Sequence, residues 1–198
     1  MGFDCLLLVP PVCRLLVTRL RNSYYFRVMP IDPSKLVIVN YPHPVLREKA
    51  KPIGKITEEV VAVAIRMLQL MHEAPGVGLA APQVGLSWRM FVANPTGEAE
   101  DDRVFINPTL SDPSRSVEDY EEGCLSLPDI RAIIRRPKAM TVTATDLDGK
   151  EFTLTSDELP ARVWQHEFDH LEGVLILDRM SLADKVANKR KIKELEEA

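Results

Sequence analysis

Cysteine is scarce in this chain of 198 residues, which contains only Cys5, Cys13 and Cys124. A small, odd number excludes the disulfide framework that staples many small secreted domains, and it fits a reducing compartment. Cys5 and Cys13 could pair only within a short N-terminal stretch. Cys124 is therefore expected to remain a free thiol.

Long apolar runs and a strong net charge are also absent. The run Leu6–Val12 is broken by Pro10 and Pro11, whereas a membrane-spanning helix needs about 20 mostly apolar residues. The formal net charge of −4 gives no basis for a general affinity for nucleic acid or anionic lipid. We expect neither DNA nor a membrane as a partner.

The first 29 residues differ from the rest in charge. They carry four arginines against one acid, a sum of +3, contributed by Arg14, Arg19, Arg21, Arg27 and Asp4. Either the natural protein starts at Met29, or the segment is an organelle-targeting peptide. We expect residues 1–29 to be a poorly ordered extension and residues 30–198 to form one domain. The expected location is cytoplasmic, or an organelle if residues 1–29 are a targeting peptide.

Hydrophobic periodicity predicts three helices. The first follows the capping residue Thr57 and ends before Pro75. The second begins within residues 156–160 and runs to Leu171, where Gly173 is placed to end it. The third, Ala183–Glu196, is charged and amphipathic.

Short β-branched or alternating runs predict the strands, namely Arg89–Ala93, Val104–Asn107, Ala139–Asp146, Glu151–Thr155 and Val174–Asp178. Asp148-Gly149 predicts a hairpin turn. Gly76–Gln83 is expected to be a loop of small residues, and Ser111–Glu122 an acidic connector. Alternating strands with a few helices predict an α+β fold in one domain, built on antiparallel β-sheets.

The strongest chemical signal is the segment Gln165-His166-Glu167-Phe168-Asp169-His170. On a helix, His166 and His170 lie on one face with Cβ atoms about 5–6 Å apart, so both imidazoles can bind one cation. Glu167 is turned about 100° around the helix and suits a general base acting on water. The alternative is two surface histidines, but two of only four histidines fall in this pattern. We therefore expect the antiparallel sheets to surround a central metal-binding helix.

Two imidazoles leave the ligand set incomplete. No histidine follows His170, and Glu172 is too near in sequence to complete the site from the same helix. Cys124 is a better candidate, because a thiolate binds zinc and iron strongly. Taken alone, however, Cys124 favours a buried and inert thiol, the commoner state of a free cysteine.

A third segment, Gly76-Val77-Gly78-Leu79-Ala80-Ala81-Pro82-Gln83, is rich in small residues. Its two glycines let the backbone approach a ligand closely, and Gln83 offers an amide donor. By itself the segment could also be a tight loop that the fold requires.

Together the three segments resemble the peptide deformylase family. That family is marked by Gly-φ-Gly-φ-Ala-Ala-x-Gln (φ apolar), Glu-Gly-Cys-Leu-Ser and Gln-His-Glu-x-Asp-His-Leu-x-Gly. The same motifs stand in this order, without a departure, at Gly76–Gln83, Glu122–Ser126 and Gln165–Gly173. The similarity extends from about Leu36 to Asp184, which implies a deformylase-like catalytic domain within residues 30–198.

The resemblance implies removal of the formyl group from the N-terminal formylmethionine of newly made polypeptides, with release of formate. The protein ligands of the metal would be Cys124, His166 and His170. Glu167 would deprotonate a water molecule and later protonate the departing amine. Gln83 and the backbone N–H of Leu125 would donate to the carbonyl oxygen, each worth about 2.7–4 kcal/mol if they act as other oxyanion-hole donors do.

The resemblance also implies a narrow substrate pocket and a particular metal. The expected substrate-binding residues are Gly76, Val77, Gly78, Val163 and Arg131. The two valines could equally be core, and Arg131 and Arg136 could support substrate, support Glu122 or be solvated. One thiolate and two imidazoles alone would point to zinc. The family instead implies one Fe²⁺ per chain, with zinc, nickel or cobalt able to occupy the site.

Two other functions stay open. One is a general zinc peptidase of the His-Glu-x-x-His type, against which the missing downstream ligand argues. The other is a non-catalytic protein that docks on ribosomes, which would be expected to have lost a ligand or Glu167. Basic residues in the last helix could contact ribosomal RNA or form a solvated face: Lys185, Lys189, Arg190, Lys191 and Lys193.

Overall fold

The computed structural model describes residues 15–20, 23–28 and 31–197, and the chain divides into two units, residues 1–32 and 33–198. In the first unit, strand β1 (Leu15–Leu20) pairs antiparallel with β2 (Ser23–Val28). Cys5, Cys13 and the run Leu6–Val12 lie outside the described residues. The domain boundary at residue 30 stays a prediction. No helix among the described residues is long and apolar enough to cross a membrane.

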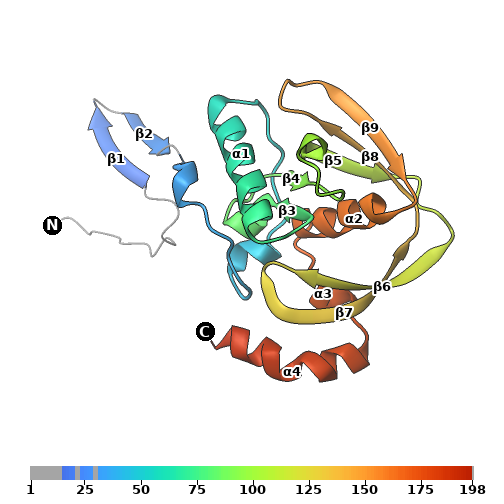
Figure 1. Ribbon diagram of the computed structural model, residues 1–198. Helices are drawn as coiled ribbons and strands as arrows, with labels where there is room; N and C mark the ends of the chain where they lie inside the picture. The colour runs from blue at the N-terminus through green and yellow to red at the C-terminus, as the bar shows by residue number, and fades with distance from the viewer. Residues whose placement is uncertain (1–14, 21–22, 29–30, 198) are drawn as a thin grey trace. The chain divides into compact units, whose positions relative to one another are not determined.

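A five-stranded antiparallel sheet forms one layer of the second unit (Figure 1). Its strands, in spatial order, are β3 (Gly78–Ala80), β4 (Met90–Ala93), β5 (Arg103–Ser111), β8 (Met140–Thr145) and β9 (Glu151–Ser156). The predicted Asp148-Gly149 turn joins β8 to β9, and Gly149 adopts the left-handed φ of +80° that favours glycine. Alternate residues of β8, including Val142 and Ala144, enter the core, as their alternation with threonine predicts.

A second sheet consists of β6 (Val117–Cys124) and β7 (Leu127–Pro137), which are also antiparallel. Along β7 every second residue is buried from Ile130 to Arg136, so one face of this hairpin is covered. Cys124 ends β6, and the turn that follows it carries Leu125 and Ser126.

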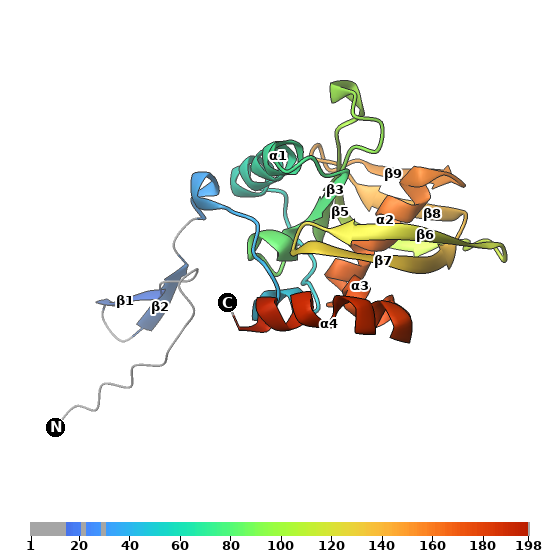
Figure 2. The same ribbon diagram turned by 60° about the horizontal axis from the view of Figure 1, so that its bottom comes forward.

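Helix α2 (Leu159–Leu171) lies between the two sheets, as both views show (Figures 1 and 2). Pro160 occupies its first turn, where the missing N–H has no intrahelical partner to lose. Gly173, with φ of +72°, follows its end. Val163, Trp164 and Leu171 bury one face of α2 in the same core as β4, β5 and β8. This confirms the predicted α+β fold with antiparallel sheets around a central helix.

The remaining helices cover the outside. Thr57 caps α1 (Glu58–Glu73) by accepting a hydrogen bond from the Val60 N–H. The C-terminal helix α4 (Leu182–Glu196) packs on β7, where Asn188 donates to the Arg131 carbonyl at 2.9 Å. Between α2 and α4 lies the short helix α3 (Ile176–Arg179). Four 3₁₀ helices complete the described elements: η1 (Pro33–Lys35), η2 (Pro44–Arg47), η3 (Ala81–Val84) and η4 (Ala99–Asp101).

Three predicted segments differ from the structure. Gly76–Gln83 is not only a loop, because it contains β3 and most of η3. The acidic connector Ser111–Glu122 contains most of β6, where Glu122 is buried against Arg136 of β7 and Arg162 of α2 and Asp119 forms an exposed ion pair with Arg135. Val174–Asp178 is not a strand: it leads into α3, where the Asp178 carboxylate accepts a hydrogen bond from the Leu175 N–H at 2.8 Å.

Candidate metal centre

Three potential ligands from two elements meet beside α2. Cys124 comes from the end of β6, while His166 and His170 lie one turn apart on α2. One ligand atom from each lies within 4.8 Å of the others. The Cys124 Sγ is 3.4 Å from the His170 Nε2, and the centroids of the His166 and His170 rings are 5.1 Å apart. In the part of the chain that the structure describes, no other such group of three occurs.

The donor set fits a transition-metal cation. A thiolate and two imidazoles at about 2.0–2.3 Å from one ion lie at most about 4.6 Å from one another, close to the 4.8 Å within which the three ligand atoms lie here. His166 Nδ1 lies 2.9 Å from the Glu122 carboxylate and must donate to it, which directs Nε2 toward Cys124. Such a carboxylate contact fixes the tautomer of a metal-binding histidine.

The pKa values of the two imidazoles are shifted in opposite directions. Burial acts to lower the pKa of His166, but hydrogen bonds to Cys124 and Glu122 outweigh it and raise the pKa to about 10. Burial and the neighbouring His166 charge hold the pKa of His170 well below its usual value. Because a metal binds only the neutral imidazole, cation binding should release a proton from His166.

Glu167 lies on the same helix and faces the backbone of β3. Its side chain is buried, and its Oε2 atom has no hydrogen-bond partner among the described residues. Burial raises its pKa to about 7, despite the opposing charges of His166 and Arg136. A Cβ on Gly78 would lie only 2.4 Å from the Glu167 Oε1, so the glycine makes room for this carboxylate. A carboxyl group that titrates near neutrality suits proton transfer.

Gln83 is oriented toward the thiol by its own backbone neighbours. Its Oε1 accepts the Ala80 N–H at 2.8 Å, which turns the amide nitrogen toward Cys124 Sγ at 3.5 Å and Ser126 Oγ at 3.4 Å. The amide orientation therefore presents N–H donors to the site. Gly76 lies against Leu125, because a Cβ on this glycine would meet the Leu125 Cδ1 at 2.8 Å.

The expected substrate residues fall in different environments. Val77 is 45% exposed beside the two glycines, whereas Val163 is 4% exposed within the core. The Arg131 guanidinium covers Gly123, where a Cβ would meet its Cζ at 2.9 Å. The structure thus places Gly78 against Glu167 and Gly76 against Leu125, the residue after Cys124, whereas Val163 lies on the core-facing side of α2.

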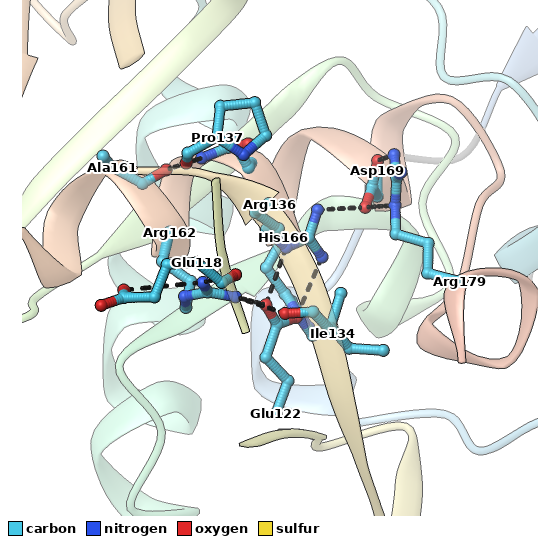
Figure 3. A network of polar contacts seen from close by, with 11 residues as sticks. Glu118, Glu122, Ile134, Arg136, Pro137, Ala161, Arg162, His166, Asp169 and Arg179 are labelled. Carbon is cyan, nitrogen blue, oxygen red and sulfur yellow. Dashed lines mark hydrogen bonds and ion pairs between the residues drawn. The ribbon is translucent and has the colours of Figure 1, made fainter. Parts of the chain in front are cut away.

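A buried ionic network supports the centre from the side of β6 and β7 (Figure 3). Arg136 donates to both oxygens of Glu122 at 2.7 and 2.9 Å, and Arg162 donates to Oε1 at 2.8 Å. Arg136 also donates to Asp169 at 2.7 Å. Despite burial, hydrogen bonds from His166 and Arg136 hold the pKa of Glu122 well below its usual range. Glu122 is therefore an anion that accepts from His166.

Residues 35–186 match the family model described as Polypeptide deformylase. The chain belongs to this family. A peptide deformylase from Agrobacterium fabrum is 44% identical over 146 residues, which cover 73% of this chain and 86% of that protein. The chloroplastic/mitochondrial peptide deformylase 1B of Arabidopsis thaliana is 43% identical over 150 residues, or 75% of this chain and 55% of the plant protein. The chain thus spans just over half the length of the plant relatives from Arabidopsis and Solanum lycopersicum.

Solved deformylase structures agree with the fold. A plant peptide deformylase superposes with a TM-score of 0.79 at 39% identity, covering 83% of this chain and 90% of that one. The enzyme from Plasmodium falciparum gives 0.78 at 35% identity, covering 81% and 95%. These solved structures therefore resemble the chain in both fold and sequence.

Arg162 and Asp169 belong to the ionic network and Ser126 contacts Gln83, although the sequence analysis assigned none of the three to the site. Arg162, His166 and Asp169 stand at i, i+4 and i+7, so they form one polar stripe along α2. That spacing is visible in the sequence and could have identified the two charged residues. Nothing in the sequence pointed to the Ser126 hydroxyl as a neighbour of Gln83.

Because the Glu122 carboxylate is stabilised in the folded protein, we expect the free energy of unfolding to fall in acid. Its pKa is lower in the folded protein than in the unfolded chain, so its contribution is present above the unfolded value of 4.5 and is lost as the pH falls below it. We expect Glu122→Gln to remove this part of the pH dependence, measured as urea unfolding at pH 7 and pH 3. Glu121→Gln, on the exposed side of β6, is the control and should keep the wild-type pH dependence.

Proposed function

We propose that this chain is a metal-dependent hydrolase that removes the formyl group from the N-terminal formylmethionine of newly made polypeptides and releases formate. One observation carries the proposal: a thiol, two imidazoles, a buried carboxyl group and an oriented amide converge on one site. Membership of the deformylase family supports the same reaction.

The proposed metal ligands are Cys124, His166 and His170. We propose Fe²⁺ as the ion in the cell, with zinc, nickel or cobalt able to replace it. When bound, such an ion acts as a Lewis acid and makes water more acidic. The Glu122 carboxylate holds His166 in the tautomer that leaves Nε2 free for binding.

The protein's own groups would move the protons and orient the substrate. Glu167 accepts a proton from water as the new C–O bond forms, and returns it to the amine nitrogen as the C–N bond breaks. The Gln83 amide and the Leu125 backbone N–H donate to the carbonyl oxygen, where negative charge develops. Hydrolysis then yields formate and a free N-terminal amine, with atoms and protons in balance.

Substrate choice is proposed to depend on the glycine segment. The backbone at Gly76 and Gly78 lies close against Leu125 and Glu167, and this leaves little room for an acyl group larger than formyl. Val77 and Arg131, which are exposed, are proposed to support the methionine side chain and peptide. Val163 is also proposed, although it is 4% exposed and would have to act from the core side of α2. Formylated nascent peptides are the proposed substrates.

An anaerobic assay of formate release tests the proposal. The iron-loaded protein should release formate from a formyl-Met peptide and should leave an unformylated peptide intact. Cleavage of the unformylated peptide would favour a general zinc peptidase instead. No formate release by the loaded protein would reject the proposed function.

The catalytic domain is proposed to comprise residues 30–198, with residues 1–29 as an extension. The proposed location is the cytoplasm, or an organelle if residues 1–29 act as a targeting peptide, and the Arabidopsis relative is described as chloroplastic/mitochondrial. A fusion of residues 1–29 to a fluorescent protein decides between them. Diffuse fluorescence would exclude organelle targeting by this segment.

A contact between α4 and the ribosome is also proposed. Lys189 and Arg190 are exposed on α4. The Lys191 ammonium instead donates a hydrogen bond to the Asp129 carbonyl, within the protein itself. Reversing both exposed charges, by Lys189→Glu with Arg190→Glu, should reduce co-sedimentation with ribosomes. Equal co-sedimentation of the variant and the wild type would exclude this face of α4.

Gly78→Ala should strongly reduce activity because the added methyl group would displace Glu167. The built Cβ lies 2.4 Å from Glu167 Oε1, and a shift of about 1 Å in a catalytic group can cost about 100-fold in rate. Gly54→Ala is the matched control, since a Cβ there meets nothing within 4 Å. Equal kcat values for the two variants would show that Gly78 does not position the carboxylate.

A further inference from the structure

The ionic network reaches the surface at Arg179, on the short helix α3. The Arg179 Nε donates to the Asp169 Oδ2 at 2.5 Å, and its Nη2 donates to Oδ1. The Arg179 side chain is 41% exposed, whereas Asp169 is largely buried. Arg179 is therefore the one partner of Asp169 in this network that solvent reaches (Figure 3).

From Asp169, charged hydrogen bonds continue without a break to a proposed metal ligand. Asp169 Oδ2 also accepts from Arg136, and Arg136 holds Glu122 through two further nitrogens. Glu122 in turn accepts from His166 Nδ1. The path joins α3 to the imidazole through three groups whose side chains are 11%, 3% and 6% exposed, namely Asp169, Arg136 and Glu122.

Removal of the Arg179 side chain would leave the Asp169 carboxylate with fewer hydrogen-bond donors. Asp169 would lose two donors, and a buried carboxylate that lacks partners costs free energy. Its remaining cation is Arg136, so Asp169 would draw this guanidinium toward itself and away from Glu122. Because Glu122 fixes the His166 ring, a shift of Arg136 changes how the imidazole is presented.

We propose that Arg179 is a positioning residue that holds His166 ready for metal binding from a distance, through Asp169, Arg136 and Glu122. The inference rests on the proposed metal site. Arg179 touches neither the ligands nor the proposed substrate, so its effect must pass through the other three groups.

A neighbouring ion pair on α3 provides a matched control. Arg47 of η2 pairs with Asp178, the residue before Arg179, and the Arg47 side chain is 37% exposed. Arg179→Gln and Arg47→Gln thus each remove one ion pair of α3 that is made by an arginine of similar exposure, 41% and 37%. Among the interactions described, only the first of these pairs connects to Glu122.

The test measures the affinity of each variant for Co²⁺ by competition with a chelator, beside the free energy of unfolding without metal. Arg179→Gln should weaken Co²⁺ binding about tenfold, the lower end of the range for outer partners of metal ligands. Arg47→Gln should leave the affinity unchanged. In a Glu122→Gln background, Arg179→Gln should have no further effect on affinity, because the path is already cut.

Equal weakening by both arginine variants would overturn the inference, because it would show only a looser α3. Unchanged or tighter Co²⁺ binding by Arg179→Gln would also overturn it. If the wild type binds no Co²⁺ at all, the proposed metal site itself fails, and the inference fails with it. Partial recovery of affinity in Arg179→Lys would support a role for the positive charge at this position.

Discussion

Replacing Glu167 with glutamine is expected to lower the rate of formate release by about 100- to 10,000-fold, the usual contribution of general acid–base catalysis. Glutamine keeps the shape of the side chain but cannot accept the proton of water. Burial raises the pKa of this carboxyl group to about 7, so it can both take and return a proton near neutral pH. The measurement is kcat for a formyl-Met peptide with the iron-loaded variant under anaerobic conditions.

Metal content separates this effect from a loss of the site. Glu167→Gln should retain the wild-type amount of metal, because its carboxyl group is not among the three proposed ligands. Glu158→Gln is the control: this exposed glutamate stands at the N-terminus of the same helix and makes no capping hydrogen bond through its side chain. An active Glu167→Gln enzyme would contradict the assignment of the general base.

Arg136→Met is expected to destabilise the protein by about 3–5 kcal/mol, the typical cost of removing one partner from a buried ion pair. Arg136 is 2% exposed and pairs with both Glu122 and Asp169. Methionine fills a similar volume but leaves Asp169 with Arg179 alone and removes two of the donors to Glu122. The measurement is the free energy of unfolding in urea at neutral pH.

The neighbouring residue provides the comparison. Arg135 projects from the opposite face of β7, where it forms an exposed bidentate pair with Asp119. Exposed pairs contribute little because water solvates both charges, so Arg135→Met should leave stability almost unchanged. Similar losses in the two variants would mean that the charge of β7, rather than the buried network, determines the stability.

The sequence predicted the parts of the site that obey local spacing rules. His166, Glu167 and His170 are fixed by the period of one helix, and their convergence followed from that period alone. Ligand chemistry made Cys124 a candidate, but only the resemblance to a family decided for it, because a free cysteine is more often an inert core residue. The structure brings its sulfur within 3.4 Å of His170, across 46 positions in sequence.

Local spacing could mark Arg162 and Asp169 on one face of α2, but it could not predict which charged residues pair with them. The acids of β6 suggested a solvated connector, since such residues are depleted in strands. Glu122 alone among them is buried, and its burial depends on Arg136 and Arg162, which lie 14 and 40 residues away in sequence. Asp169 was visible inside the metal motif, but its partner Arg179 directly follows the segment that was predicted as a strand and is in fact the last residue of α3. Partners this distant are brought together only by the packing of α2 between the sheets.

Cys124 sits on one sheet, while both histidines sit on the helix that the two sheets enclose. In an unfolded chain these three groups are far apart, so a metal ion would bind the native state with much higher affinity than the unfolded chain. A free ion concentration of 100 times the dissociation constant would raise the free energy of unfolding by about 2.7 kcal/mol. Heating should therefore melt the protein and release its ion in a single event, and the melting temperature should report occupancy directly.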